Sequence, residues 1–125
     1  MTLEGYNTFC AALPATHTVV QWGGAHVWKL GDKVFAIART DDGTALSVTF
    51  KCSWASFEIL KQQPGLRPAP YLASRGMSWI QRQTDEAMPD EALQDYLRES
   101  HRLVAAKLTQ RVRAELGLEV PTGSR

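Results

Sequence analysis

The sequence has few of the features that mark metalloproteins and secreted disulfide-bonded domains. Its 125 residues include only two cysteines, Cys10 and Cys52, and these are not spaced as a CxxC pair. His17, His26 and His101 are far apart and have no cysteine or carboxylate partner at ligand spacing. Zinc sites usually show short, regular ligand spacings. The sequence therefore predicts no metal site, and two reduced thiols of the kind found in cytoplasmic proteins.

Recognisable catalytic and cofactor motifs are also missing. Gly23-Gly24 and Gly31 lack the Gly-Lys-Ser/Thr or three-glycine spacing of a phosphate-binding loop, so we interpret them as hairpin turns. Ser100 and His101 are adjacent on an expected helix, where neighbouring side chains point about 100° apart and cannot act as nucleophile and base. Ser100 is expected to fill a tight place on the helix, with its hydroxyl bonded to a carbonyl one turn earlier. The sequence predicts no catalytic residues, no cofactor and no enzymatic activity.

Strong net charge and long apolar runs are absent as well. The formal net charge is +1, which gives no overall attraction to polyanions. No apolar run approaches the roughly 20 residues that a membrane span needs, and Met1 to Leu13 does not resemble a signal peptide. We expect a soluble cytoplasmic protein without membrane contact. Residues 1–120 are expected to form a single domain, with residues 121–125 as a frayed tail.

The helix signals that are present fall in three places. Thr2 and Ser53 are suitable N-caps for two short helices, the first ending before Pro14 and the second before Pro64-Gly65. Between Pro89 and Gly117 an apolar stripe recurs at helical spacing, which predicts one helix of about seven to eight turns. Its buried face should include Leu97, Val104 and Leu108.

Short β-rich runs separated by glycine and aspartate turns predict an antiparallel sheet. The expected strands are His17–Trp22, His26–Leu30, Lys33–Arg39, Ala45–Phe50 and Met77–Arg82, and Arg67–Leu72 is expected to be an extended loop or edge segment because of its prolines. The fold class is therefore α+β: a two-layer sandwich, an antiparallel sheet with helices packed on one face, in the order α-β-β-β-β-α-β-α.

The run Ala45–Lys51 indicates how the sheet is covered. Leu46, Val48 and Phe50 alternate with the polar residues Ser47 and Thr49. Alternation of this kind places one face of a strand in the core and leaves the other polar. The sheet is therefore covered on one side only, or its second face holds a ligand.

Six segments of the sequence are informative when they are taken together: Lys33-Val34-Phe35-Ala36, Val48-Thr49-Phe50-Lys51, Pro68-Ala69-Pro70-Tyr71-Leu72, Gly76 to Trp79-Ile80, Pro89-Asp90-Glu91-Ala92-Leu93 and Ser100-His101-Arg102-Leu103-Val104. With these segments the chain resembles the MmcQ/YjbR family over residues 3–116. The resemblance implies a CyaY-like or secretion-chaperone-like α+β domain. It also implies a DNA-binding role that uses β-hairpin wings.

Local basic segments would have to carry that DNA binding. From Lys51 to Arg82 the chain has five basic residues against one acidic residue, and its Arg67–Arg75 loop places an aromatic side chain between two arginines. The Thr40–Gly43 tip carries two aspartates and should be repelled by phosphates, so the Gly31–Lys33 turn is the better wing. The residues predicted to contact DNA are Lys29, Lys33, Lys51, Arg67, Tyr71, Arg75 and Arg82. Without a base-reading helix, binding should be weak and non-specific.

A second hypothesis uses the open face of the sheet as a binding site for a small ligand or a protein partner. The residues predicted to line that site are Trp28, Thr49, Lys51 and Trp79. Trp22 and Trp54 flank turns and are expected to belong to the core.

Overall fold

The computed structural model describes residues 1–40, 46–70 and 76–118. Six antiparallel strands form one sheet in the order β1-β2-β3-β4-β6-β5. The strands are β1 (Thr16–Gln21), β2 (Ala25–Leu30), β3 (Lys33–Thr40), β4 (Leu46–Lys51), β5 (Leu66–Pro68) and β6 (Trp79–Arg82). The short β5 is an edge strand, as the prolines predicted. The predicted α+β class and order of elements are confirmed.

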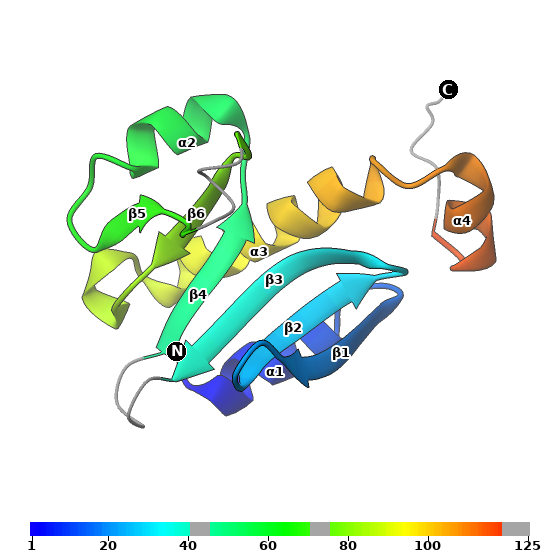
Figure 1. Ribbon diagram of the computed structural model, residues 1–125, viewed down its shortest axis with the longest axis horizontal. Helices are drawn as coiled ribbons and strands as arrows, with labels where there is room; N and C mark the ends of the chain where they lie inside the picture. Colours follow the sequence, from blue (N-terminus) through cyan, green and yellow to red (C-terminus); the bar gives the residue numbers. More distant parts are fainter. Residues whose placement is uncertain (41–45, 71–75, 119–125) are drawn as a thin grey trace.

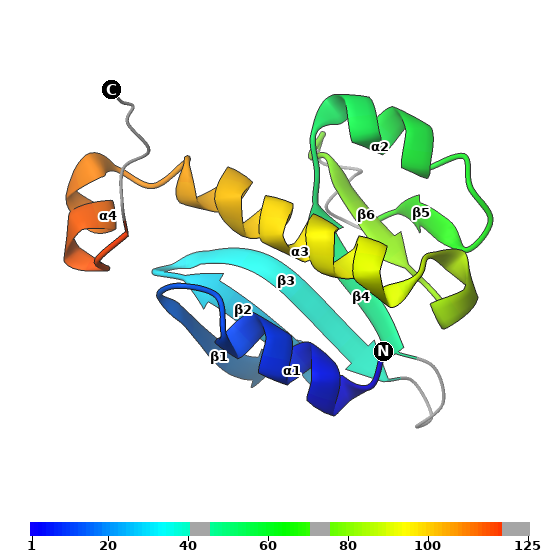
Figure 2. The ribbon, with the colours of Figure 1, turned by 180° about the vertical axis from the view of Figure 1, so that it is seen from behind.

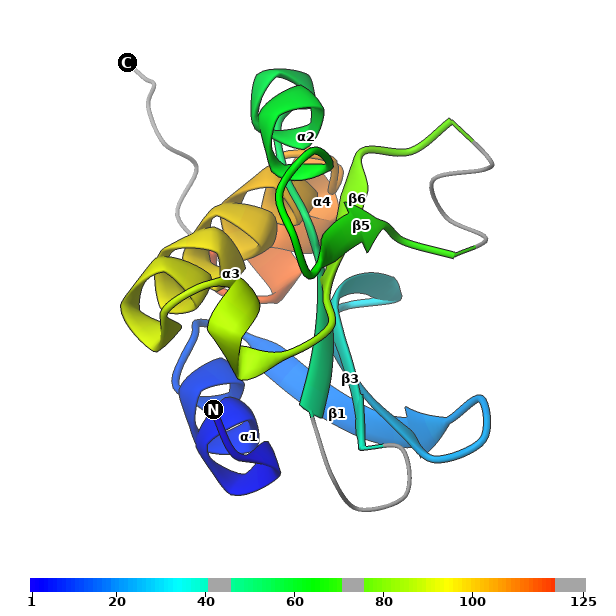
Figure 3. The same cartoon turned by 90° about the vertical axis from the view of Figure 1, so that its left-hand side faces the viewer.

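The two long helices lie on one face of this sheet (Figures 1 and 2). They are α1 (Leu3–Ala11) and α3 (Asp90–Ala105), while α2 (Trp54–Leu60) contacts β5 and β6. Figure 3 shows the sheet edge-on, with α1 and α3 on the same side of it. The opposite face of β3, β4 and β6 is open among the residues that the structure describes.

Both predicted N-caps are confirmed. The Thr2 side chain accepts a hydrogen bond from the Gly5 amide, and the Ser53 side chain accepts one from the Ser56 amide. Each cap satisfies a donor that the first turn of a helix leaves unpaired. The start of both helices is therefore set by local sequence.

The prediction of a single long C-terminal helix, made from the apolar stripe, is wrong. Helix α3 ends at Ala105, and a separate helix α4 (Gln110–Glu115) begins after Thr109, whose hydroxyl accepts from the Val112 amide. A β-carbon built on Gly31 would lie 3.8 Å from both Val112 and Leu116, so α4 packs beside the β2–β3 turn. The break thus lets the chain turn toward the end of the sheet.

The core lies between the sheet and the helix layer. Leu97, Val104 and Leu108 are buried there, as the stripe predicted. Cys10 and Cys52 are free, buried thiols, and burial raises their pKa values to about 12 and about 11. Both thiols are therefore protonated near neutral pH.

Strands β3 and β4 separate at one end and form a fork. Their pairing runs from Ala36 with Phe50 to Thr40 with Leu46, and a β-bulge interrupts the pairing of β2 with β3. Past Ala36, Ser100 of α3 bridges the two strands, because its hydroxyl donates to the Phe35 carbonyl (2.6 Å) and accepts from the Lys51 amide (2.9 Å). The expectation that Ser100 bonds within its own helix is therefore wrong.

Candidate functional site

A groove of about 890 Å³ lies on the open face of the sheet and reaches the fork. Its apolar lining comes from Trp22, Val34, Ile37, Pro70, Met77, Trp79 and Val104, and its polar lining from Asp32, Lys33, Arg39, Thr49, Lys51, Gln81 and Lys107. Figure 1 looks onto this face, with α3 visible behind the fork. Because the strands part there, the end of α3 contributes lining residues to a groove that is otherwise built on strands.

The charge of the groove is strongly one-sided. The lining contains four basic residues but only one acidic residue, Asp32. The basic residues are Lys33, Arg39, Lys51 and Lys107. This local excess exists although the whole chain carries a net charge of only +1. Exposed charges act over about 8 to 10 Å in cellular salt, so a ligand in the groove responds to these side chains more than to the net charge.

Lys51 and Lys107 lie close enough to influence each other at the fork. Desolvation by burial lowers the pKa of Lys51, and the positive charge of Lys107 lowers it further. Across the described residues, neither lysine forms an ion pair with a carboxylate. The fork therefore concentrates positive charge that an anionic ligand would neutralise.

Two tryptophans give the groove its aromatic surface. Trp22 is 56% exposed and holds a left-handed backbone conformation (φ 53°) in the β1–β2 turn, whose Gly23 carbonyl accepts a hydrogen bond from Arg39. Trp79 is only 4% exposed, and its buried indole N–H has no acceptor in the described part of the chain. Trp22 thus offers a ring face for stacking, and Trp79 an unpaired donor.

Several of the predicted contact residues share this open face. Lys33 and Lys51 line the groove, together with Thr49 and Trp79 from the second hypothesis. Lys29 pairs with Val34, which also lines it. Arg67 lies beside the groove on β5, where its Nε donates to Gln81 Oε1 at 2.7 Å. Tyr71 and Arg75 lie outside the described residues, as do the Asp41-Asp42 tip and the predicted tail 121–125.

The structure contradicts the prediction that Arg82 contacts DNA. Arg82 is 0% exposed, and its guanidinium donates to the Met88 carbonyl and to the carboxylates of Asp85 and Asp90. Val48 pairs with Arg82, so the arginine shares the covered face of the sheet. Its donors already have partners inside the protein.

The placement of Trp28 on the open face is also wrong. Trp28 is buried in the core under α1, where its indole N–H donates to Asn7 Oδ1 at 2.9 Å. Trp22 and Trp54 are exposed, contrary to the expectation that both belong to the core.

Three groove residues were missed by sequence reasoning: Trp22, Arg39 and Lys107. The phase of Arg39 with Ile37 on one strand was an available signal, whereas the position of Lys107 depends on the fork.

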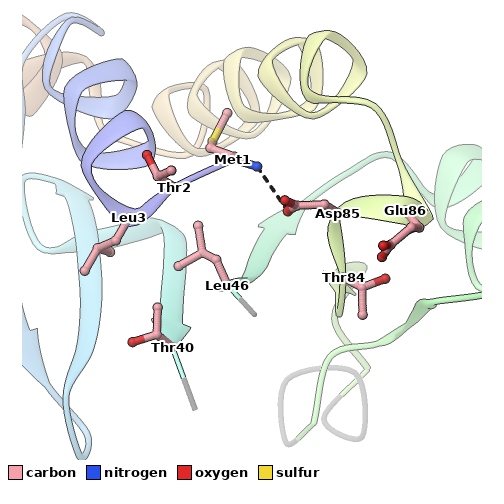
Figure 4. A pocket seen from close by; sticks show the side chains of 8 residues that line it. All are labelled: Met1, Thr2, Leu3, Thr40, Leu46, Thr84, Asp85 and Glu86. Carbon is pink, nitrogen blue, oxygen red and sulfur yellow. Dashed lines mark ion pairs between the residues drawn. The ribbon is translucent and has the colours of Figure 1, made fainter. Parts of the chain in front are cut away.

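A second hollow, of about 600 Å³, lies between the start of α1 and the 3-10 turn Asp85–Ala87 (Figure 4). The Met1 amine forms ion pairs there with Asp85 (3.0 Å) and Asp90 (3.1 Å). The hydrogen bond from this amine lowers the pKa of Asp90, and the hydrogen bond and positive charge of Arg82 lower it further. Of the charged groups that line this hollow, the Met1 amine and Asp85 are paired with each other and only Glu86 has no ion pair among the described residues, so the basic groove is the better candidate for ligand binding.

The described residues were compared with the patterns of metal-binding groups and of membrane-spanning helices. Within residues 1–40, 46–70 and 76–118, no three His, Cys, Asp or Glu side chains gather as a metal-binding group. Over the same ranges, every helix is too short or too polar to cross a lipid bilayer.

Ser100→Ala tests whether the hydroxyl bridge holds the fork. We expect the free energy of unfolding to fall by about 1 to 3 kcal/mol, because the buried Phe35 carbonyl loses its donor, while water in the groove can replace the bond to the Lys51 amide. Ser47→Ala on β4 is the control, since Ser47 is only half-buried and its hydroxyl makes one long contact (3.5 Å). Chemical denaturation measures both. If neither Ser100→Ala nor Ser47→Ala changes the free energy of unfolding, the hydroxyl bridge has no structural role.

The fold and groove define an α+β domain with one helix-covered face and one open, basic face. A sequence model of the YjbR family matches residues 11–103, and the chain belongs to this family. It is similar in structure to the Deinococcus radiodurans protein DR2400, whose crystal structure carries a DUF419 domain, with 25% sequence identity and a TM-score of 0.76. The similarity covers 99% of this chain and 95% of that one. No curated protein matches the sequence.

Proposed function

We propose that this YjbR-family domain is a non-enzymatic module that binds nucleic acid weakly and without sequence specificity. The observation that carries the proposal is the excess of basic side chains around the open-face groove. Phosphate contacts by lysine and arginine supply most of non-specific binding to nucleic acids. The contacts would come from Lys33, Lys51 and Arg67, with Arg39 and Lys107 added from the groove lining.

Single strands suit the groove better than duplexes. Proteins that bind single strands combine a basic groove with aromatic side chains on which unpaired bases stack. Trp22 supplies such a ring at the groove, at 56% exposure. In a duplex the faces of the bases are stacked on one another and cannot reach it.

The second candidate is a small anionic ligand held in the same groove. It is favoured by one observation, the buried Trp79 indole N–H without an acceptor in the described chain. Buried donors usually have partners, and a ligand oxygen could serve as one. A protein partner on this face would compete for the same surface.

Fluorescence anisotropy with labelled single-stranded and duplex DNA at two salt concentrations tests the proposal. We expect dissociation constants on the order of 10⁻⁴ to 10⁻⁶ M near physiological salt, similar for different sequences and tighter for single strands. The double variant Lys33→Ala/Lys51→Ala should weaken binding and reduce the salt slope by about 1.4 units, since each phosphate contact on a single strand contributes about 0.7. The DNA should be recovered intact after incubation.

The double variant Lys61→Ala/Arg98→Ala is the matched control. It removes the same charge, but Lys61 at the end of α2 and Arg98 on α3 form exposed ion pairs with Glu58 and Asp95. We expect binding close to that of the wild type. An equal loss in both double variants would show that overall charge, and not the groove, determines binding, and undetectable binding at low salt would refute the proposal.

A further inference from the structure

We infer that the fork is a terminal-phosphate subsite, at which Lys51 and Lys107 bind the phosphate monoester at the end of a nucleic-acid strand in preference to the internal phosphodiesters. This inference rests on the proposed function, because it assigns a preferred group to one end of the same groove. It makes the domain a reader of strand ends.

The first reason is the arrangement of positive charge at the fork. Lys51 ends β4, and Lys107 follows the last turn of α3, so two elements far apart in the chain bring two ammonium groups to one place. After desolvation by burial, the positive charge of Lys107 is the next cause that lowers the pKa of Lys51. With no carboxylate paired to either in the described residues, their charge is available to a ligand.

The second reason is the charge of the two kinds of phosphate. An internal phosphodiester carries one negative charge, whereas a phosphate monoester carries about 1.5 to 2 near pH 7 and has three acceptor oxygens. Two neighbouring ammonium groups repel each other, and a dianion relieves that repulsion more completely than a monoanion does. The paired lysines therefore distinguish the strand end from its interior.

The third reason is an unpaired hydrogen-bond donor on the residue paired with Lys51. Trp79 is the direct partner of Lys51 in the β4–β6 pairing, and both line the groove. The Trp79 indole N–H is buried without an acceptor among the described residues, which costs free energy. An additional phosphate oxygen near this ring would offer the acceptor that the protein itself does not supply there.

The position of the acidic residue in the groove lining supports the assignment to the fork. Asp32 lines the groove from the β2–β3 turn and is adjacent in sequence to Lys33. Arg67 is on the same face but outside the groove lining, with its Nε bonded to Gln81. Lys51 and Lys107 both line the groove, and neither is adjacent in sequence to an acidic residue.

The test uses one single-stranded oligonucleotide in three forms: with a 5′-phosphate, with a 3′-phosphate, and with hydroxyls at both ends. For the full chain we expect one of the phosphorylated forms to bind on the order of tenfold more tightly than the hydroxyl form, equivalent to one added charge-assisted hydrogen bond. Lys107→Ala should reduce this ratio to near one. Arg67→Gln should weaken all forms to the same extent and leave the ratio unchanged.

The outcomes separate the inference from the function on which it rests. If all three forms bind equally to the wild-type protein, or if Arg67→Gln reduces the ratio as much as Lys107→Ala does, the subsite is refuted while nucleic-acid binding stands. If none of the forms binds at low salt, the proposed function fails as well. Matching melting temperatures of the variants and the wild type establish that each variant is folded.

Discussion

Leu97→Ala is expected to lower the free energy of unfolding by about 2 to 5 kcal/mol, the usual cost of emptying a leucine site in a well-packed core. Leu97 lies on α3, is 0% exposed and belongs to the core cluster. Helix α3 makes its largest sets of contacts with β3 and β4, so a cavity here weakens the junction of the two layers. Urea unfolding monitored by circular dichroism measures the change.

Ile59→Ala is the matched control for that experiment. Ile59 is also a large aliphatic residue on a helix, but it is 62% exposed on α2. Its truncation should change stability by no more than about 0.5 kcal/mol. If Leu97→Ala unfolds at the same urea concentration as the wild type, the helix does not pack on the sheet through this face.

Arg82→Met is expected to destabilise the protein by about 2 to 4 kcal/mol. Removing the guanidinium leaves the buried Met88 carbonyl without its donor, and each such group costs about 1 to 3 kcal/mol. The carboxylates of Asp85 and Asp90 are half exposed or more and regain water, so the loss stays below that of a fully buried ion pair. Thermal and urea denaturation measure the difference.

Arg98→Met controls for the loss of an arginine. Arg98 is 55% exposed in an ion pair with Asp95, and exposed pairs contribute about 1 kcal/mol at most. The folded fraction of Arg82→Met should bind DNA as the wild type does. A stable Arg82→Met protein with lost DNA affinity would show that Arg82 contacts phosphate after all.

Local sequence signals were sufficient to predict most of the fold. Thr2 and Ser53 cap helices where the sequence predicted them, because a cap depends on side chains within three residues. The break between α3 and α4 was missed because the apolar stripe continues through it. Thr109, which caps α4, was a signal that the periodicity concealed.

The candidate site was only partly predictable, because it combines strand alternation with a non-local junction. Alternation along β4 placed Thr49 and Lys51 on the open face correctly. The same alternation rule argued against placing Trp28 on the open face, because Trp28 is in phase with Leu30, which belongs to the core. The contribution of Lys107 could not be predicted, since it depends on where β3 and β4 separate.

Arg82 shows a different limit of sequence reasoning. A basic residue at the end of a strand is usually solvated, and its phase with Ile80 was the indication that it faces the helices. Its burial depends on the Met88 carbonyl and the acidic start of α3, which close around it in the fold. Such a network cannot be read from residue type alone.

The central claim is that ligands bind in the groove on the open face, and amide chemical shifts during titration with a single-stranded oligonucleotide test it most directly. We predict changes at Trp22, Lys33 and Lys51, including the indole N–H signals of Trp22 and Trp79, with little change along the outer face of α3 around Arg98. Changes that cluster instead on the helix layer, or around the hollow at Met1, would contradict the account.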